Sequence, residues 1–403
     1  MWLVRRLVGL IQLLLPVVAF AAAPEIPSPA QPPTIEIHTL HELWRLDNEA
    51  DPELPLLGTP TQSVVDGKGH LLVLDAQMAQ VLEISPTGEF LRTLGRAGQG
   101  PGEMERPNTL FLVGDDRLGL VQIFPGRIVL LTRDGRPAGS VDAQGANPML
   151  YRVAWVGDGY VAVERRTEYD ADLSKARSHT VLARYGPDGE RRCSYLESEF
   201  VESQDPPVMD EKAGWFPYRA WDVAADGSVL VASARDAYRI EWYEPDGSLR
   251  RVLTRPFEPH RRTAAERDKV KRSMRMWRGG AEIELKKIIM DTEPAIEEIR
   301  VHTDGRIWVR TCYGDRDLPD GILRRYDVFD ATGRLEAEVR LAWQVNRDRD
   351  YFDLLTDGRV AWYRNARSAV NARFAAVEDR ATEDEDLSED ELRVQVILLA
   401  GER

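Results

Sequence analysis

A short phrase recurs along most of this chain and constrains its fold more than any other feature. Each copy has a proline, an apolar run, a glycine-type turn, two further apolar runs and a second turn. The second turn is clearest at five places: Thr87-Gly88, Asp134-Gly135, Asp188-Gly189, Asp246-Gly247 and Thr332-Gly333. Internal repetition of this kind indicates an array of like structural units, each packed on its neighbours.

The apolar runs are short, are rich in Val, Ile, Leu, Tyr and Trp, and are separated by turn residues, as β-strands in hairpins are. Units begin at Pro60, Pro107, Pro148, Pro217 and Pro294, and a sixth begins near Tyr351. Four antiparallel strands in each unit predict an all-β chain, folded as a six-bladed β-propeller over residues 35–403. A pair of β-sandwiches is the alternative, but it does not explain the recurring spacing from proline to glycine.

The last unit predicts how the ring closes. It reaches its second turn only at Gly401, so a fourth strand is missing there. The apolar segment Ile35–Leu40, followed by Leu43 and Trp44, precedes the first unit. We expect this segment to pair with Val394–Leu399, because the pairing would complete the last blade and remove two exposed sheet edges.

The N-terminus has the pattern of an export signal. Arg5 and Arg6 precede the apolar stretch Leu7–Phe20, and small residues flank Phe20, so residues 1–21 are predicted to be a signal peptide. The protein is therefore expected to be periplasmic or secreted. An uncleaved N-terminal anchor is the alternative, and it is the one feature that would hold the protein near a membrane.

The proline-rich residues 22–34 are expected to form an extended linker, with ordered structure beginning near Ile35. Both cysteines, Cys193 and Cys312, fall in units that are not neighbours, so they are expected to remain separate thiols.

Three insertions interrupt the repeat. Residues 256–293, between the fourth and fifth units, are locally basic, and Thr263 to Glu266 has the spacing of a capping box. We expect a helix from there to Trp277 and a second helix over residues 281–289. Residues 197–215 are expected to be an irregular loop. The strongly acidic residues 378–391 are expected to be a solvated loop, with a calcium loop as the alternative.

The sequence has none of the common catalytic or cofactor motifs, such as His-Glu-x-x-His, Cys-x-x-Cys, Gly-x-Ser-x-Gly or a phosphate loop. The six histidines are scattered, so no metal site and no cofactor is predicted. The formal net charge of -14 would repel a phosphate backbone, which argues against nucleic acid as a partner.

The innermost strands of a propeller bring residues from every blade to a common axis. The positions just after each unit's proline are polar or aromatic, where a purely structural strand would begin with apolar residues. We therefore predict a ligand-binding central channel, with solvated channel lining as the alternative, at Gln62, Asn108, Arg152, Arg219, Glu298 and Tyr351.

The first unit resembles an NHL repeat in four segments: Pro60–Asp66, Gly69–Asp75, Val81–Ile84 and Gly88–Gly95. Residues 98–107 are similar to the connection between blades in bacterial six-bladed propellers that carry export signals, and residues 294–309 resemble the same group. This resemblance covers most of residues 58–340. It implies the six-bladed fold and little about activity, because propellers host both binding and enzymatic functions.

The sequence therefore leaves two hypotheses about function, the first of which it favours. The first is an exported propeller with no evident catalytic motif, which binds a ligand or a protein or acts as a scaffold. The basic helical insertion would be a docking arm. The alternative is a metal-dependent lactonase, esterase or lyase with an axial site. That enzyme would need a ring of carboxylate and amide ligands, for which Glu298 and Asn108 are the obvious candidates.

Overall fold

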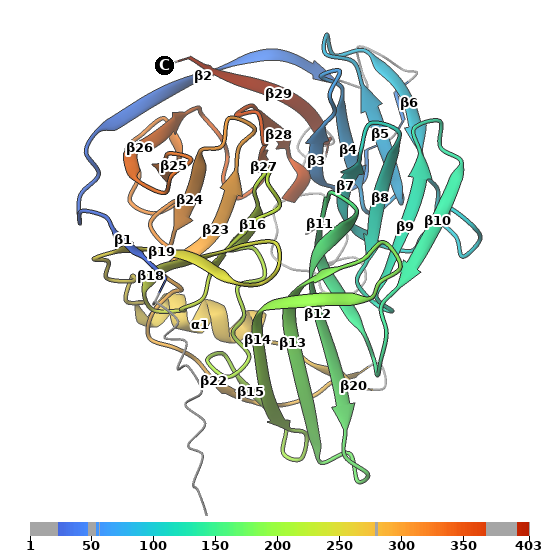
Figure 1. Ribbon diagram of the computed structural model, residues 1–403, viewed down its shortest axis with the longest axis vertical. Helices are drawn as coiled ribbons and strands as arrows, with labels where there is room; N and C mark the ends of the chain where they lie inside the picture. The colour runs from blue at the N-terminus through green and yellow to red at the C-terminus, as the bar shows by residue number, and fades with distance from the viewer. Residues whose placement is uncertain (1–22, 47–53, 56, 279–280, 368–392, 403) are drawn as a thin grey trace, which may run out of the picture.

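The computed structural model describes residues 23–46, 54–55, 57–278, 281–367 and 393–402. The regular secondary structure of these residues is nearly all β, with one α-helix, and the strands form a propeller-like ring of sheets (Figure 1). The predicted signal peptide, residues 1–21, and the acidic segment 378–391 lie outside the described residues.

Three four-stranded antiparallel sheets follow one another along the chain. The first contains β3 (Pro60–Val65), β4 (Leu71–Asp75), β5 (Gln80–Ile84) and β6 (Phe90–Leu94). The second contains β7 (Pro107–Val113), β8 (Arg117–Gln122), β9 (Arg127–Thr132) and β10 (Pro137–Asp142). The third contains β11 (Met149–Val156), β12 (Gly159–Tyr169), β13 (Lys175–Tyr185) and β14 (Arg191–Ser203).

The fourth sheet has five strands: β16 (Trp221–Val223), β17 (Val229–Ala232), β18 (Tyr238–Tyr243), β19 (Leu249–Arg255) and β1 (Glu25–Pro27). Strand β1 pairs in parallel with β19, and Ile26 packs against the apolar core of this sheet. The proline-rich segment is thus extended, but part of it lies on the ring. The expectation that ordered structure begins near Ile35 is wrong, because β19 supplies hydrogen-bond partners that the local sequence does not reveal.

The last sheet is continuous over eight strands: β23 (Ile296–Val301), β24 (Ile307–Thr311), β25 (Ile322–Phe329), β26 (Leu335–Ala342), β2 (Ile35–Leu46), β29 (Gln395–Glu402), β28 (Val360–Arg364) and β27 (Tyr351–Leu354). Residues 39–46 of β2 pair antiparallel with β29, as predicted. Residues 35–39 also pair in parallel with β26. Four sheets therefore stand as separate blades, and the last two predicted units are joined by β2, which is long enough to bond both.

Buried apolar side chains fill the space between consecutive sheets. One cluster joins the first sheet to the last strands, packing Leu71 and Ile84 against Trp44, Tyr363 and Val396. Gly88 lies against this cluster with a φ of +91°, and a Cβ atom there would lie 2.7 Å from Cγ of Trp44. Glycine is required at this turn, both by its left-handed backbone and by the indole that covers it.

The insertion at residues 256–293 contains the predicted helix α1 (Ala264–Ser273), whose capping box between Thr263 and Glu266 is present. The helix ends at Ser273 rather than at Trp277. The second predicted helix is wrong, since that region contains β21 (Ala281–Glu282), paired with β20 (Trp277–Arg278), and β22 (Lys286–Ile288). Strand β22 pairs in parallel with β15 (Val208–Asp210), a distant segment whose bonds override the local helix propensity.

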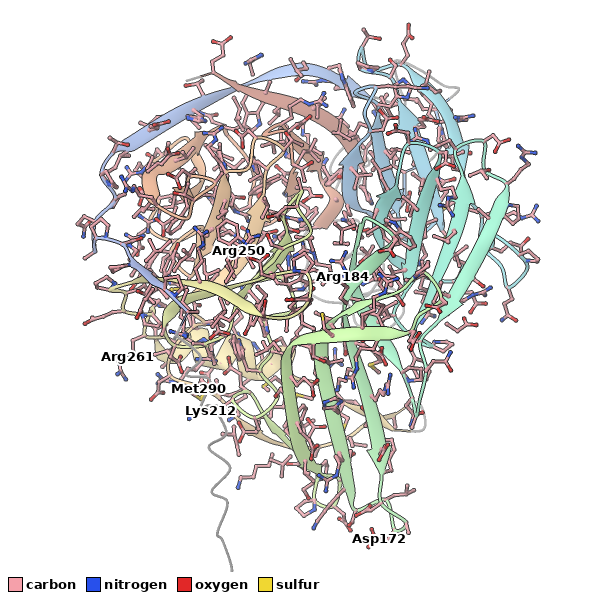
Figure 2. The ribbon with its side chains drawn as sticks, viewed as in Figure 1. Asp172, Arg184, Lys212, Arg250, Arg261 and Met290 are labelled. Atoms are coloured by element: carbon pink, nitrogen blue, oxygen red, sulfur yellow. The ribbon has the colours of Figure 1, made fainter. Side chains whose placement is uncertain are left out.

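The loop predicted over residues 197–215 is also partly wrong, because β14 continues to Ser203 and β15 follows. Strands β12 to β14 extend beyond the ring, and Asp172 lies at the tip of the β12–β13 hairpin (Figure 2). Cys193 and Cys312 are separate thiols, as predicted. Within the described part of the chain, no helix has the length and apolar character needed to cross a membrane.

Candidate functional site

The six residues predicted to face the axis all line one cavity of about 270 Å³. Each lies in, or two residues before, the first strand of its unit, and these strands (β3, β7, β11, β16, β23 and β27) surround the centre of the ring (Figure 1). The structure therefore brings the six predicted side chains together. Whether they bind a ligand stays a prediction. Six further residues complete the lining: Thr61, Thr109, Tyr151, Tyr218, Arg300 and Asp353.

Arg152 links the innermost strand of the third sheet to that of the fourth. Its Nη2 donates to Oδ1 of Asp222 at 2.9 Å, and its Nη1 donates to the carbonyl of Trp221, whose ring lies 4.6 Å from the guanidinium carbon. Burial lowers the pKa of Arg152 to about 10, although Asp222 opposes this shift. The other carboxylate oxygen of Asp222 accepts from the backbone N–H of Val301 in β23, at 2.9 Å.

Glu298 is buried among arginines from three positions. Its Oε1 accepts from Arg219 at 3.2 Å and from Arg300 at 3.1 Å, and its Oε2 accepts from Arg310 at 3.1 Å. Burial alone would raise the pKa of Glu298, but Arg300, Arg219 and Arg310 outweigh burial and hold that pKa well below its usual range. The carboxylate is therefore ionised and fully engaged.

Asp353 connects these hydrogen bonds to the first sheet. Its Oδ1 accepts from Nη2 of Arg300 at 3.2 Å, and its Oδ2 accepts from the backbone N–H of Ser63 in β3, at 3.1 Å. Burial raises the pKa of Asp353, and Arg300 only partly opposes the shift. One aspartate thus joins β23, β27 and β3.

The remaining two junctions use amide and hydroxyl groups. Oε1 of Gln62 accepts from the backbone N–H of Leu110 at 2.9 Å, which joins β3 to β7. Nδ2 of Asn108 and Oγ1 of Thr109 both donate to the carbonyl of Tyr151, at 3.0 and 3.1 Å, which joins β7 to β11. Hydrogen bonds therefore link all six innermost strands in a complete circuit.

Sequence reasoning missed Asp222, Arg300 and Asp353. Two of them carried a signal: Arg300 lies two residues after Glu298, and Asp353 two residues after Tyr351. Alternate residues of a strand share a face, so both positions follow from the predicted ones. Asp222 lies three residues after Arg219 and follows no such rule.

Some polar groups of the residues that line the cavity have few or no protein partners. Oδ1 of Asn108 and Oγ1 of Thr61 are buried without a hydrogen-bond partner. The side chain of Arg219 is 52% exposed, although it lies among buried residues, and it makes one side-chain hydrogen bond, to Glu298. The Glu298 carboxylate raises the pKa of Arg219, so the guanidinium is charged. The rings of Tyr151 and Tyr218, with centroids 4.6 Å apart, add an apolar wall.

A second cavity, of about 590 Å³, adjoins the axial one, and Thr61 and Tyr351 line both. Its lining also includes Lys269, which lies on helix α1 of the insertion. The helix therefore reaches the same region as the inner strands of the first and last units.

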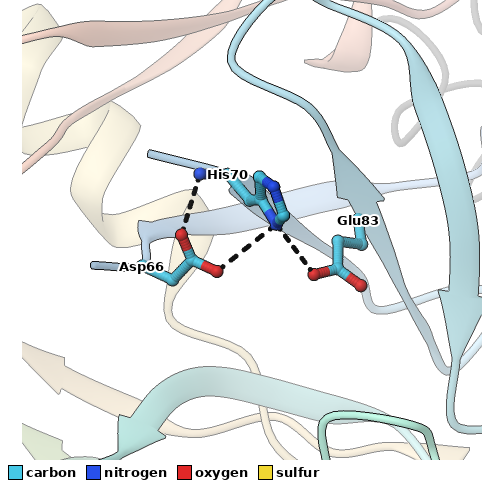
Figure 3. Close-up of side chains that lie close together, drawn as sticks. All are labelled: Asp66, His70 and Glu83. Carbon is cyan, nitrogen blue, oxygen red and sulfur yellow. Dashed lines mark hydrogen bonds and ion pairs between the residues drawn. The ribbon is translucent and has the colours of Figure 1, made fainter. Parts of the chain in front are cut away.

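A separate cluster of Asp66, His70 and Glu83 has metal-ligand character (Figure 3). One ligand atom from each lies within 4.8 Å of the others, and Nδ1 of His70 is 3.1 Å from Oε1 of Glu83. Nη2 of Arg133, in the turn between β9 and β10 of the second sheet, donates to Oδ2 of Asp66 at 2.8 Å and also to Oε1 of Glu83. The Arg133 guanidinium thus binds the carboxylate oxygens that a metal ion would need as ligands. The cluster also links the first two sheets.

Comparisons with known proteins give distant structural similarities and no family. No family model matches the sequence, and no curated protein resembles it by sequence. Among solved structures, a Bacteroides fragilis protein thought to be exported is 10% identical, with a TM-score of 0.49, covering 94% of this chain and 100% of its own. Virginiamycin B lyase from Staphylococcus aureus is 11% identical, with a TM-score of 0.44, covering 90% and 99%. Dihydro-heme d1 dehydrogenase is 14% identical, with a TM-score of 0.36, covering 76% and 62%.

Proposed function

We propose that this protein is an exported, six-bladed β-propeller that binds a small ligand in its axial cavity. The six-blade count follows if the eight-stranded sheet is taken as two blades, β23–β26 and β27–β29 with β2. Export is proposed from the signal sequence at residues 1–21 and would place the protein in the periplasm or outside the cell.

One observation carries the binding proposal. Polar side chains from six innermost strands converge on a single cavity that retains a half-exposed guanidinium, that of Arg219. Arg219 makes one side-chain hydrogen bond, and a charged group with further donors at the wall of a cavity favours a bound polar molecule. The cavity is smaller than the roughly 300–1,000 Å³ of pockets for drug-sized ligands, so the ligand should be small.

Binding is favoured over catalysis by how the acidic groups are used. Asp222, Glu298 and Asp353 each accept hydrogen bonds from an arginine, and two of them also accept from a backbone N–H. A general base or an open set of metal ligands needs carboxylate oxygens that a reactant can reach. No observation at the axis therefore supports the metal-dependent lactonase, esterase or lyase.

The test is a thermal-shift screen of the purified protein against a library of small neutral, cationic and anionic metabolites. At least one compound should raise the melting temperature, and Arg219→Gln should abolish the shift. Arg136→Gln is the matched control, because Arg136 is an exposed arginine outside the cavity. An absence of hits, or an undiminished shift in the Arg219 variant, would overturn the proposal.

A further inference from the structure

The two carboxylates that line the axial cavity are already used by the protein. Glu298 and Asp353 are both buried. Glu298 accepts hydrogen bonds from three arginines, and Asp353 accepts from Arg300 and from a backbone N–H. A cationic ligand in this cavity would therefore find no free carboxylate with which to pair.

The three arginines that line the cavity differ in how far the protein uses them. Arg152 donates to three protein oxygens, and Arg300 donates to two carboxylates. Arg219 uses only one of its five N–H donors in a side-chain hydrogen bond, to Glu298. Among the described residues that line this cavity, Arg219 is also the only one that is exposed. The free charged group at the axis is therefore positive, and it belongs to Arg219.

Arg219 can bind a ligand without leaving a buried charge unpaired. Glu298, its partner at 3.2 Å, also accepts from Arg300 and from Arg310, each at 3.1 Å. If Arg219 turned toward a ligand, the Glu298 carboxylate would keep two guanidinium partners. The cost of exchanging this one hydrogen bond is therefore small compared with the cost of breaking a lone buried ion pair.

Tyrosine rings form the apolar part of the cavity wall. Tyr151, Tyr218 and Tyr351 line the cavity and are half-buried. The centroids of Tyr151 and Tyr218 are 4.6 Å apart, and Tyr351 stacks on Tyr363 with an interplanar angle of 7°. Rings held in this way offer fixed apolar surfaces to a bound molecule. The cavity thus combines one available cation with aromatic walls.

We propose that the axial ligand is a small organic anion, with a carboxylate or phosphate group bound by Arg219 and an apolar, ring-sized body packed on the tyrosines. This inference rests on the proposed axial binding function and names the class of its ligand. The Arg219 guanidinium donates two parallel N–H groups to two oxygens of the anion, the arrangement in which arginine binds carboxylates and phosphates most strongly.

The adjoining cavity adds a long-range effect. Its described lining includes Lys269 and Arg367, which are both exposed, and one acid, Asp348. Within the part of the chain that the structure describes, neither Lys269 nor Arg367 forms an ion pair. Because they line a different cavity from Arg219, they act on the anion through their electric field and not by contact. Such a field raises the rate of association of an oppositely charged ligand.

Four probes test this chemistry by isothermal titration of the full chain. Benzoate has both the anionic group and the ring, benzamide keeps the shape but is neutral, and acetate keeps the carboxylate without the ring. Phenyl phosphate replaces the carboxylate with a phosphate. We expect benzoate or phenyl phosphate to bind at least about tenfold more tightly than benzamide and than acetate. The tighter of the two anions identifies the group that Arg219 prefers.

Variants separate the contact from the field. Arg219→Gln should remove the preference for benzoate over benzamide, whereas Arg219→Lys, which keeps the charge but not the planar fork, should retain part of it. Lys269→Gln should slow the association of the anion several-fold at low salt, leave its dissociation unchanged, and have no effect at high salt. Lys175→Gln is the matched control, because Lys175 is an exposed lysine at the start of β13 and outside both cavities.

The outcomes distinguish this inference from the proposed function. If neutral or cationic compounds from the library bind and no anion does, the anion inference is wrong and axial binding survives. Equal affinity for benzoate and benzamide, or a preference for benzoate that persists in Arg219→Gln, would also overturn the inference. An association rate unchanged in Lys269→Gln would remove the role of the adjoining cavity. If nothing binds, both proposals fail.

Discussion

Arg152 and Asp222 form a buried ion pair between β11 and β16, with 2.9 Å between Nη2 and Oδ1. The sequence predicts a ligand-binding role for Arg152 and none for Asp222, yet the geometry of the pair is that of a structural link. Arg152 also bonds the Trp221 carbonyl, and Asp222 also bonds the Val301 N–H. This pair therefore holds three successive inner strands together, and Arg219 is the arginine left for a ligand.

Replacing Arg152 should destabilise the fold far more than replacing Arg219. Arg152→Met leaves Asp222 as a buried charge without its counterion, which costs about 3–5 kcal/mol of unfolding free energy. Arg219→Met should cost less than about 1 kcal/mol, since its side chain is 52% exposed and Glu298 keeps two other arginines. Urea denaturation of the two variants measures the difference, and equal losses would contradict the assignment of roles.

His302 should make stability depend on pH. It is 5% exposed and stacks on Trp308 with centroids 4.6 Å apart, and burial lowers its pKa to about 4. Between about pH 6.5 and pH 4 the unfolded chain would bind a proton at this site that the folded protein does not. The stability contributed by neutral His302 is thus complete above pH 6.5 and falls by about 3 kcal/mol as pH drops to 4.

His302→Phe keeps an aromatic ring against Trp308 but does not titrate. Unfolding free energies of both proteins should be measured from pH 7 to pH 4, because their difference cancels the contributions of the carboxylates. The wild type should lose stability more steeply with falling pH than the variant does. Parallel curves would show that His302 does not titrate as its burial implies.

Gly88→Ala should be more damaging than an alanine at an otherwise similar glycine. Gly321 has a φ of +80°, close to the +91° of Gly88, but a Cβ there would meet nothing within 4 Å. Gly321→Ala should therefore cost only the backbone strain, about 1–2 kcal/mol. Gly88→Ala adds a clash with Trp44, for about 1–3 kcal/mol more. Calorimetric melting temperatures that match in the two variants would argue against the contact between Trp44 and this turn.

Removing Arg133 should convert its cluster into a metal site. Burial raises the pKa of Glu83, but hydrogen bonds from Arg92, Arg133 and His70 more than offset it and keep the carboxylate ionised. Arg133→Met frees Oδ2 of Asp66 and Oε1 of Glu83 beside His70, a set of ligands that suits zinc.

Zinc should raise the melting temperature of the Arg133→Met protein and leave that of the wild type unchanged. Adding His70→Gln to the variant should remove the effect, because it deletes the nitrogen ligand. No response to zinc in the single variant would show that the three side chains do not converge closely enough to bind an ion.

The sequence was informative where the determinants are local. Strand runs and turns recur in every unit, so the inner-strand positions from Gln62 to Tyr351 could be placed on one axis. The pairing of β2 with β29 was also predictable, because counting strands left one unit short. The prediction of a second helix failed because β22 pairs with β15, some eighty positions earlier in the chain. The contact between Arg133 and Asp66 could not be predicted for a similar reason, because no residue near Asp66 in the chain indicates a guanidinium from the next sheet.

The pairing of strand β2 restricts the order in which the protein can fold. It bonds β26 along residues 35–39 and β29 along residues 39–46, so one of the earliest strands to leave the ribosome has partners among the last. Until residues 335–342 follow, that strand lacks its β26 neighbour, and until residues 395–402 follow, its other edge lacks β29. Contacts so distant in sequence form slowly, and unpaired edges invite aggregation. If the chain crosses a membrane from its N-terminus, as we propose, the pairing of this strand would be complete only after residues 395–402 have arrived.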